Sequence, residues 1–248
     1  MMPYDEIKKT VLQGLHFMRP GKESIMSRKL FVQGIVKFVS GVLLIGLLLF
    51  GSAGTFSYWQ AWLLMGILFI PMFLAGLVMM KKNPELLKKR LNVKEEQSEQ
   101  REVILYSGIM FLAAFIAAGL NERFGWIRVP AAVSYTGAVL FLLSYALYGE
   151  VLRENAYLSR TIEVQENQKV IDTGLYGIVR HPMYMSTLVL FLSMPLVLGS
   201  VISFVIMLAY IPIIAKRIRN EEEVLEEGLP GYKEYKKKVH WKVIPYIW

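Results

Sequence analysis

The chain has 248 residues, of which 54% are hydrophobic and 19% charged, with a formal net charge of +8 and no cysteine. It is more apolar than a soluble domain usually is, and its apolar residues are gathered into long runs. The lack of cysteine excludes disulfides, thiolate nucleophiles and sulfur metal ligands.

Four apolar runs are long enough to cross a bilayer as helices of about 20 residues. They cover residues 30–51, 57–80, 102–120 and 129–151. A further run, 182–215, contains PLVLGS (195–200), in which proline and glycine permit a tight helical hairpin. We therefore expect an all-α polytopic membrane protein with about six transmembrane helices, the last two forming this hairpin.

Lysine and arginine are concentrated on one side of these predicted spans. They gather in the N-terminal arm and in segments 81–101, 153–181 and 216–248, whereas the loops 51–56 and 121–128 carry few charges. The positive-inside rule therefore predicts that both termini face the cytoplasm, from an inner membrane in a prokaryote or the endoplasmic reticulum in a eukaryote. Anionic lipid headgroups account for the basic charge, so we expect membrane lipids as partners and no nucleic acid.

Apolar residues in the N-terminal arm recur at helical spacing. They are Tyr4, Ile7, Val11, Leu15 and Met18. This pattern predicts an amphipathic helix lying at the membrane surface. We accordingly divide the chain into an interfacial segment (1–28), a four-helix membrane scaffold (29–152) and a catalytic and cofactor-binding region (153–248).

Ionisable residues are scarce within the predicted spans, which does not favour a transporter. Lys37 lies about two turns inside the first span, where its side chain can reach the membrane surface. The three histidines, His16, His181 and His240, are far apart and lack ligand spacing, so no metal site is expected.

The segment GLYGIVRHPMY (174–184) leads directly into the hairpin. Pro182 suits the first position of a helix and places His181 at the helix start beside Arg180, where backbone N–H groups and a cation attract carboxylates or phosphates. Tyr176 and Tyr184 add aromatic faces with hydroxyl tips. The alternative is a belt of aromatic and basic residues at the membrane interface.

The stretch after the hairpin, KRIRNEEEVLEEG (216–228), extends the last helix into polar surroundings. Arg217 and Glu221 then share one helix face at i, i+4, with Glu222 beside them. A helix face that is simply exposed to solvent would show the same sequence pattern. Because charged stretches flank both arms of one hairpin, however, we predict that they share a pocket, followed by a cytosolic C-terminal helix and tail.

Several short motifs in this region resemble those of the isoprenylcysteine carboxyl methyltransferase family and its bacterial and archaeal relatives. They are DTGLYGIVRHP (172–182), RHPMY (180–184), RIRNEEEVL (217–225), GYKEY (231–235) and IPYIW (244–248), with leucine at 175 where proline is common. The resemblance covers about 75 C-terminal residues strongly, and it does not specify a substrate.

The resemblance implies an integral membrane methyltransferase that uses S-adenosylmethionine and releases S-adenosylhomocysteine. A lipophilic small-molecule or prenylated acceptor, such as an isoprenylcysteine-like carboxylate, would enter from the bilayer. It assigns Arg217, Glu221 and Arg180 to catalysis, and Arg217, Tyr232 and Tyr235 to the acceptor. Cofactor binding would involve Tyr176, Arg180, His181, Pro182, Tyr184, Glu221 and Glu222.

Two rival interpretations remain. Membrane sterol or enone reductases that use NADPH share a similar late-helix and tail organisation. A non-enzymatic transporter or membrane assembly protein would bind no nucleotide-like ligand at all. An amine or phenolic acceptor, in place of a carboxylate, would need a general base such as His181 or a glutamate.

Overall fold

The computed structural model describes residues 20–82, 84–91, 98–155, 157 and 164–248. Within these residues all regular secondary structure is helical, as predicted. The expected amphipathic helix over residues 4–18 lies outside the described residues, and the division into three segments remains a prediction.

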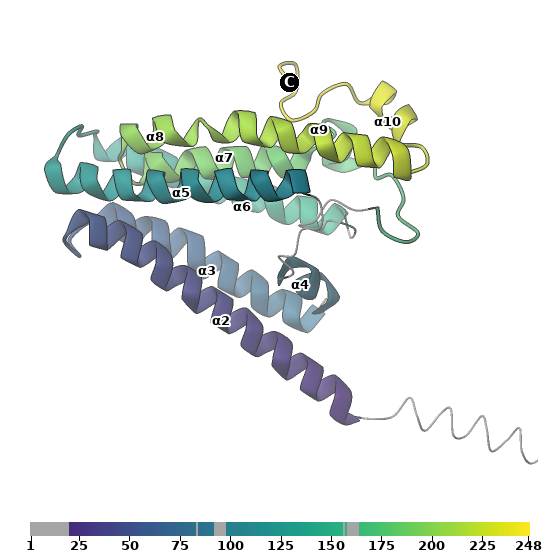
Figure 1. Ribbon diagram of the computed structural model, residues 1–248, viewed down its shortest axis with the longest axis horizontal. Helices are drawn as coiled ribbons and strands as arrows, with labels where there is room; N and C mark the ends of the chain where they lie inside the picture. Colours follow the sequence, from purple (N-terminus) through teal and green to yellow (C-terminus); the bar gives the residue numbers. More distant parts are fainter. Residues whose placement is uncertain (1–19, 83, 92–97, 156, 158–163) are drawn as a thin grey trace, which may run out of the picture.

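The first four long helices follow the four predicted apolar runs (Figure 1). They are α2 (Pro20–Ala53), α3 (Trp59–Lys82), α5 (Ser98–Phe124) and α6 (Ala131–Glu154). A short helix, α4 (Pro84–Leu91), occupies the charged connection after α3. Each long helix presents many apolar side chains to its surroundings, as expected of helices that face lipid.

The helical hairpin is present at the predicted position. Its first arm is α7 (Pro182–Val197), and its second arm is formed by α8 (Val201–Met207) and α9 (Tyr210–Gly228). Gly199 has a φ of +66°, a left-handed conformation that favours glycine at this turn. The hydroxyl of Tyr58 donates to the carbonyl of Leu198 at 2.6 Å and ties the turn to the loop before α3.

Five helices in the described part of the chain are long and apolar enough to cross a membrane. They are Lys29–Ala53, Trp59–Lys82, Arg101–Phe124, Ala131–Glu154 and Val201–Gly228. Helix α7, with 16 residues, is shorter. The hairpin therefore has unequal arms, because the second helix continues beyond the apolar run into the charged stretch.

A short irregularity separates α8 from α9 within this long arm. Pro212 has no N–H to donate to the carbonyl of Leu208, four residues earlier. That carbonyl instead accepts from the amide of Ile211 at 3.0 Å. The helix therefore tightens for one turn and then resumes, so the arm still reaches Gly228.

Small residues allow close contacts between the helices. A Cβ atom on Gly119 of α5 would lie 2.7 Å from the carbonyl oxygen of Leu49 in α2, and one on Gly137 of α6 would lie 2.7 Å from the amide nitrogen of Val197 in α7. Neither position can hold a larger side chain without moving backbone. This small-residue packing is typical of membrane helices, which have little hydrophobic drive to associate.

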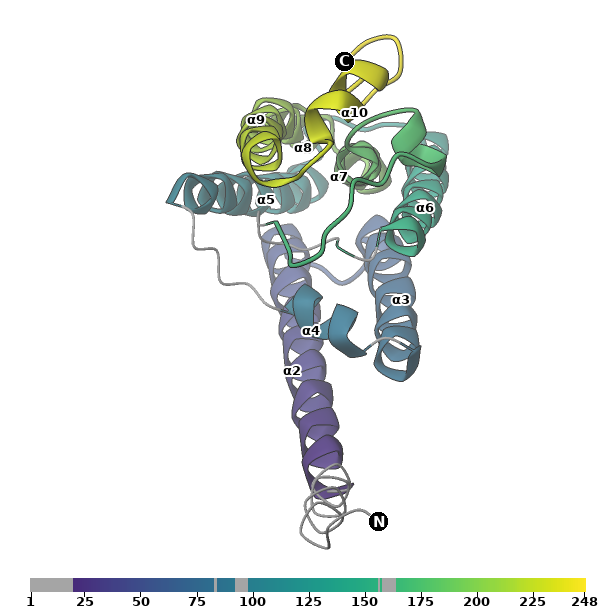
Figure 2. The same ribbon diagram turned by 90° about the vertical axis from the view of Figure 1, so that its right-hand side faces the viewer.

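Helices α5, α6, α7 and the α8–α9 arm run side by side, while α2 and α3 cross beneath them (Figures 1 and 2). The start of α7 and the end of α9 lie at the same end of this bundle. The 3₁₀ turn η1 (Gly174–Gly177) and the last helix, α10 (Tyr232–Lys238), lie there too. The arrangement thus gathers the motif-bearing segments at one end of the molecule.

Candidate functional site

The start of α7 has the predicted form. His181 precedes the helix with a φ of −126°, and Pro182 is its first residue. The amides of Arg180 and His181 donate to the carbonyls of Trp241 and Lys242 at 2.9 and 2.8 Å. We expected backbone N–H groups here to be open to a ligand, but the C-terminal tail occupies these two.

Glu222 is the centre of a buried ion-pair cluster. Its Oε1 accepts from Arg180 Nε at 2.8 Å and lies 3.2 Å from His181 Nε2. Its Oε2 lies 3.0 Å from Lys242 Nζ and 3.5 Å from Lys236 Nζ. Glu222 is 4% exposed, so one carboxylate joins α9 to α7, α10 and the tail.

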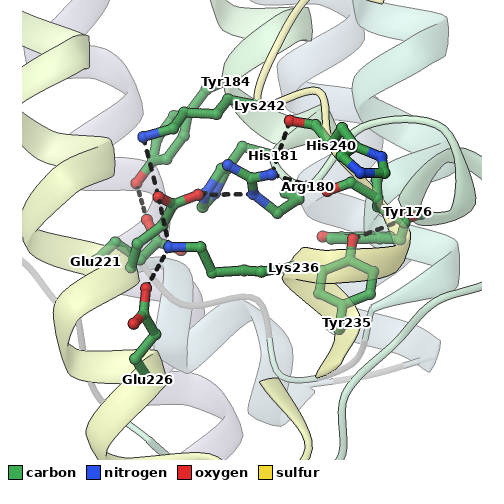
Figure 3. Close-up of polar contacts among 12 residues, drawn as sticks. Tyr176, Arg180, His181, Tyr184, Glu221, Glu226, Tyr235, Lys236, His240 and Lys242 are labelled. Atoms are coloured by element: carbon green, nitrogen blue, oxygen red, sulfur yellow. Dashed lines mark hydrogen bonds and ion pairs between the residues drawn. The ribbon is translucent and has the colours of Figure 1, made fainter. Parts of the chain in front are cut away.

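The rest of the Arg180 side chain also faces the tail. Nη1 donates to the carbonyl oxygens of Val239 and His240, both at 2.8 Å. Figure 3 shows the guanidinium of Arg180 next to the ring of His181 and the backbone of His240. The tail is therefore bonded to both the backbone and the side chain of the residues that begin the RHPMY motif.

A second polar chain links α7 to the other face of α9. The hydroxyl of Tyr184 accepts from Arg217 Nε at 3.0 Å and donates to the carboxylate of Glu221. Tyr184 is 3% exposed. The i, i+4 pair predicted from the sequence is thus bridged by a tyrosine of the RHPMY motif.

These two polar groups border a cleft of about 830 Å³, a volume that includes its open mouth. Residues from η1, α7, α9 and α10 line it, together with the segment that precedes η1. The lining residues are Asn155, Tyr157, Gln168, Lys169, Val170, Ile171, Tyr176, Arg180, His181, Met183, Tyr184, Arg217, Glu221, Leu225, Leu229, Tyr232 and Tyr235. An apolar wall with a few convergent polar groups is typical of small-molecule and cofactor sites.

Three tyrosines of the cleft differ in how their hydroxyls are used. Tyr235 donates to the carbonyl of Tyr176 at 2.7 Å (Figure 3). The hydroxyl of Tyr176 accepts from Asn155 Nδ2 at 2.9 Å. The hydroxyl of Tyr232, by contrast, is sealed from solvent and has no hydrogen-bond partner among the described residues. Burial, and after it the charge of Glu222, raises the pKa of Tyr232, so its phenol remains protonated.

The lead-in to η1 is fixed to α10 from outside the cleft. Lys238 Nζ lies 2.8 Å from Asp172 Oδ2, and this hydrogen bond lowers the pKa of Asp172. Glu154 at the end of α6 accepts from the amide of Leu175 at 3.1 Å. These contacts hold η1 against its neighbours and thereby position Tyr176.

Most of the residues that sequence analysis selected lie around the cleft. Those that line it are Tyr176, Arg180, His181, Tyr184, Arg217, Glu221, Tyr232 and Tyr235. Pro182 is the first residue of α7, and Glu222 points into the ion-pair cluster. No lining contact is found for either of these two in the described part of the chain. The roles assigned to the individual residues remain predictions.

Two groups of residues were not anticipated. Lys236 and Lys242 join the cluster around Glu222, and the segment from Gln168 to Ile171 forms one wall of the cleft. The lysines belong to a run of basic residues in which no local pattern distinguishes one from another. The wall segment lacks a motif, and only tertiary packing brings it to the cleft.

A bundle of membrane-length helices with a polar cleft at one end defines a class: a polytopic membrane protein with a candidate ligand site beside its last hairpin. Residues 135–227 match the model of the isoprenylcysteine carboxyl methyltransferase (ICMT) family. This segment contains α7, α9 and most of the residues that line the cleft. The late-helix region of the chain is therefore similar to the isoprenylcysteine carboxyl methyltransferase family, as its motifs predicted.

One curated relative is named as a sterol reductase. The Delta(14)-sterol reductase TM7SF2 of Mus musculus is 29% identical over 91 residues, which are 36% of this chain and 22% of the reductase. The matched part is thus about a fifth of that protein's length.

Proposed function

We propose that this chain is an integral membrane methyltransferase that uses S-adenosylmethionine to methylate a lipophilic acceptor, a carboxylate such as that of an isoprenylcysteine-like substrate. The observation that carries the proposal is the convergence of RHPMY (180–184) and RIRNEEEVL (217–225) on one cleft. The family match supports the same activity.

The residues present fit a zwitterionic nucleoside ligand. Arg217 and Glu221 offer charges of opposite sign, Tyr184 stands between them, and the cleft wall contains apolar side chains from Leu225 and Leu229. The unused hydroxyl of Tyr232 indicates that a further polar group is to be accommodated. When bound, S-adenosylmethionine would supply a methyl group on a sulfonium. An anionic oxygen would bond to the methyl carbon as the carbon–sulfur bond breaks, and S-adenosylhomocysteine would leave as the thioether without proton transfer.

The protein's main tasks are then to position two reactants and to exclude water. Arg217 matches a carboxylate in a fork-like geometry and would hold the acceptor without protonating it. Arg217 lies one helical turn nearer the apolar part of α9 than Glu221 does. Met183 of α7 also lines the cleft. This order suits an acceptor that arrives from the bilayer and a nucleoside that arrives from the polar end.

Membranes that contain the protein, incubated with methyl-labelled S-adenosylmethionine, test this function. We expect label in the lipophilic fraction, and release of that label as methanol after mild base, because carboxyl methyl esters are base-labile. Label that is stable to mild base would indicate that the acceptor is an amine or a phenol and not a carboxylate. If these membranes yield no more labelled product than membranes that lack the protein, the methyltransferase proposal is contradicted.

The likeness to the sterol reductase supports one other candidate, an NADPH-dependent reductase that uses the same cleft. Such an enzyme needs cations for the 2′-phosphate of NADPH. Among the lining residues Lys169 is exposed, whereas Arg180 is already bonded to Glu222 and the tail. Comparison of S-adenosylhomocysteine with NADPH as ligands separates the two activities.

A further inference from the structure

A groove lies apart from the cleft, between α2, α3 and α4. Its walls come from residues 31–38 of α2, residues 72–80 of α3, and Leu87 and Leu91 of α4. Its volume is about 940 Å³, which includes the open mouth, and it shares no described lining residue with the cleft. All of these lining residues are apolar or glycine except Lys37. The groove is therefore an apolar channel with one cation in its wall.

The groove is bounded at its ends and open in the middle. Toward the middle of α2 and α3, the ring of Phe38 packs edge-on against Phe69 at 5.6 Å and lies 5.2 Å from Phe73. At the other end α4 packs against both α2 and α3 (Figure 2). A Cβ atom on Gly76, in the wall between these ends, would meet nothing within 4 Å. The open part lies along two helices of membrane length, where a hydrocarbon chain is the natural occupant.

Lys37 places an ammonium in this apolar wall. It belongs to the membrane-length segment Lys29–Ala53, and a charged residue within such a segment is costly and usually functional. Its Nζ donates to the carbonyl of Leu91, the last residue of α4. A cation at a helix C-terminus stabilises that end, which explains one of the three N–H donors. The hydrogen bonds of the described residues use neither of the other two.

The surface next to the groove is basic. Met80 lines the groove, and the next two residues, Lys81 and Lys82, are exposed at the end of α3. In the described part of the chain neither of them has a carboxylate at ion-pair distance, whereas Lys88 of α4 lies 4.0 Å from Glu85. The positive charge that is left over at this edge attracts anionic headgroups.

We propose that the groove binds an anionic phospholipid, with an acyl chain between α2 and α3 and its phosphate at Lys37. The chain occupies the open space beside Gly76. The phosphate accepts charge-assisted hydrogen bonds from the two remaining donors of Lys37, whose long side chain reaches toward the membrane surface. Lys81 and Lys82 add to the attraction. This site does not depend on the proposed function, and either can fail without the other.

Two substitutions test the two halves of the site, and each has a matched control. Lys37→Gln removes the cation, whereas Lys29→Gln removes the same charge from a position on the same helix that is not among the described lining residues. Lys37→Arg keeps the charge and controls for a change in α4. Gly76→Leu places a side chain in the groove. Gly66→Leu is its control, because a Cβ on Gly66 of the same helix also meets nothing within 4 Å and Gly66 does not line the groove.

Native mass spectrometry of the purified protein in detergent measures its affinity for two lipids, anionic dioleoyl phosphatidylglycerol and zwitterionic dioleoyl phosphatidylcholine. The wild type should bind phosphatidylglycerol about tenfold more tightly, as for a hydrogen bond to a charged group. Lys37→Gln should abolish this preference, whereas Lys37→Arg and Lys29→Gln should keep it. Gly76→Leu should weaken binding of both lipids by about tenfold, because the chain loses apolar contacts, and Gly66→Leu should weaken neither.

Equal affinity of the wild type for the two lipids would overturn the proposal. Equal losses in Lys37→Gln and Lys29→Gln would also overturn it, because a basic surface in general would then account for the preference. Undiminished lipid binding by Gly76→Leu would place the chain outside the groove. Glycerol 3-phosphate, which has the phosphate without the chains, distinguishes a lipid from a free anion. If it displaces phosphatidylglycerol at equal concentration, the site binds a free phosphate and the lipid assignment is wrong.

Discussion

Arg180 and Glu222 form an ion pair at 2.8 Å between side chains that are 6% and 5% exposed. The pair joins two segments that are 42 residues apart along the chain. In so buried a position water screens the attraction little, and loss of either partner leaves an uncompensated charge. Glu222 therefore acts on the site by holding Arg180, His181 and the tail in place.

Glu222→Ala should destabilise the protein by about 3–5 kcal/mol, because it leaves several cations facing one another around an empty position. Thermal unfolding in detergent measures this effect. Glu223→Ala is the control, since Glu223 is the next residue of the same helix and is exposed. Equal unfolding temperatures for the two variants would show that the cluster contributes nothing to stability.

Arg217→Ala and Glu221→Ala should each lower kcat/KM by about 100-fold or more, because positioning of the reactants is the main catalytic contribution expected here. Both proteins should remain inserted in the membrane and folded. Arg219→Ala, an exposed residue on the same helix, should keep wild-type activity. Full activity in Arg217→Ala or Glu221→Ala would remove that residue from the site.

Tyr184→Phe should keep the fold and lower kcat by about tenfold, since it deletes the hydroxyl that joins Arg217 to Glu221. The comparison is Tyr58→Phe, which deletes a buried hydroxyl bonded to Leu198 at the far end of the hairpin. That variant should unfold at a lower temperature with unchanged kcat. If both tyrosine variants lose only stability, the bridge between Arg217 and Glu221 has no role in turnover.

Removal of residues 239–248 should abolish binding of S-adenosylhomocysteine. These residues supply the carbonyls that accept from the side chain of Arg180 and from the amide of His181. Without them the RHPMY motif loses the contacts that fix it. Tyr246→Ala is the control, because Tyr246 is 86% exposed. Undiminished binding by the shortened chain would show that the tail is dispensable for the cleft.

Local sequence patterns predicted most of the fold. Hydropathy located the four long helices within a few residues, and the proline and glycine of PLVLGS located the hairpin turn, which the structure places at Gly199. The continuation of the last helix brought Arg217 and Glu221 to one face. These features depend on residues close together in the chain, which is why pattern alone reveals them.

The sequence does not show which of Glu221 and Glu222 lines the cleft and which joins the ion-pair cluster. Neighbouring residues on a helix point about 100° apart, so only one of the two can face the cleft squarely, but nothing local indicates which. The tail presented the same difficulty. Its carbonyls accept hydrogen bonds from Arg180, which is 59 and 60 residues away in the chain. Every residue has a backbone carbonyl, so the residue types in the sequence do not identify these acceptors.

The most direct test of the central claim is thermal unfolding of the purified protein, titrated with S-adenosylhomocysteine and separately with NADPH. At about 100 times the dissociation constant a ligand stabilises its protein by about 2.7 kcal/mol, or about 5–10 °C for a chain of this length. We predict such a rise with S-adenosylhomocysteine, its loss in Glu221→Ala, and no rise with NADPH. A rise with NADPH and none with S-adenosylhomocysteine would contradict the methyltransferase assignment and favour a reductase.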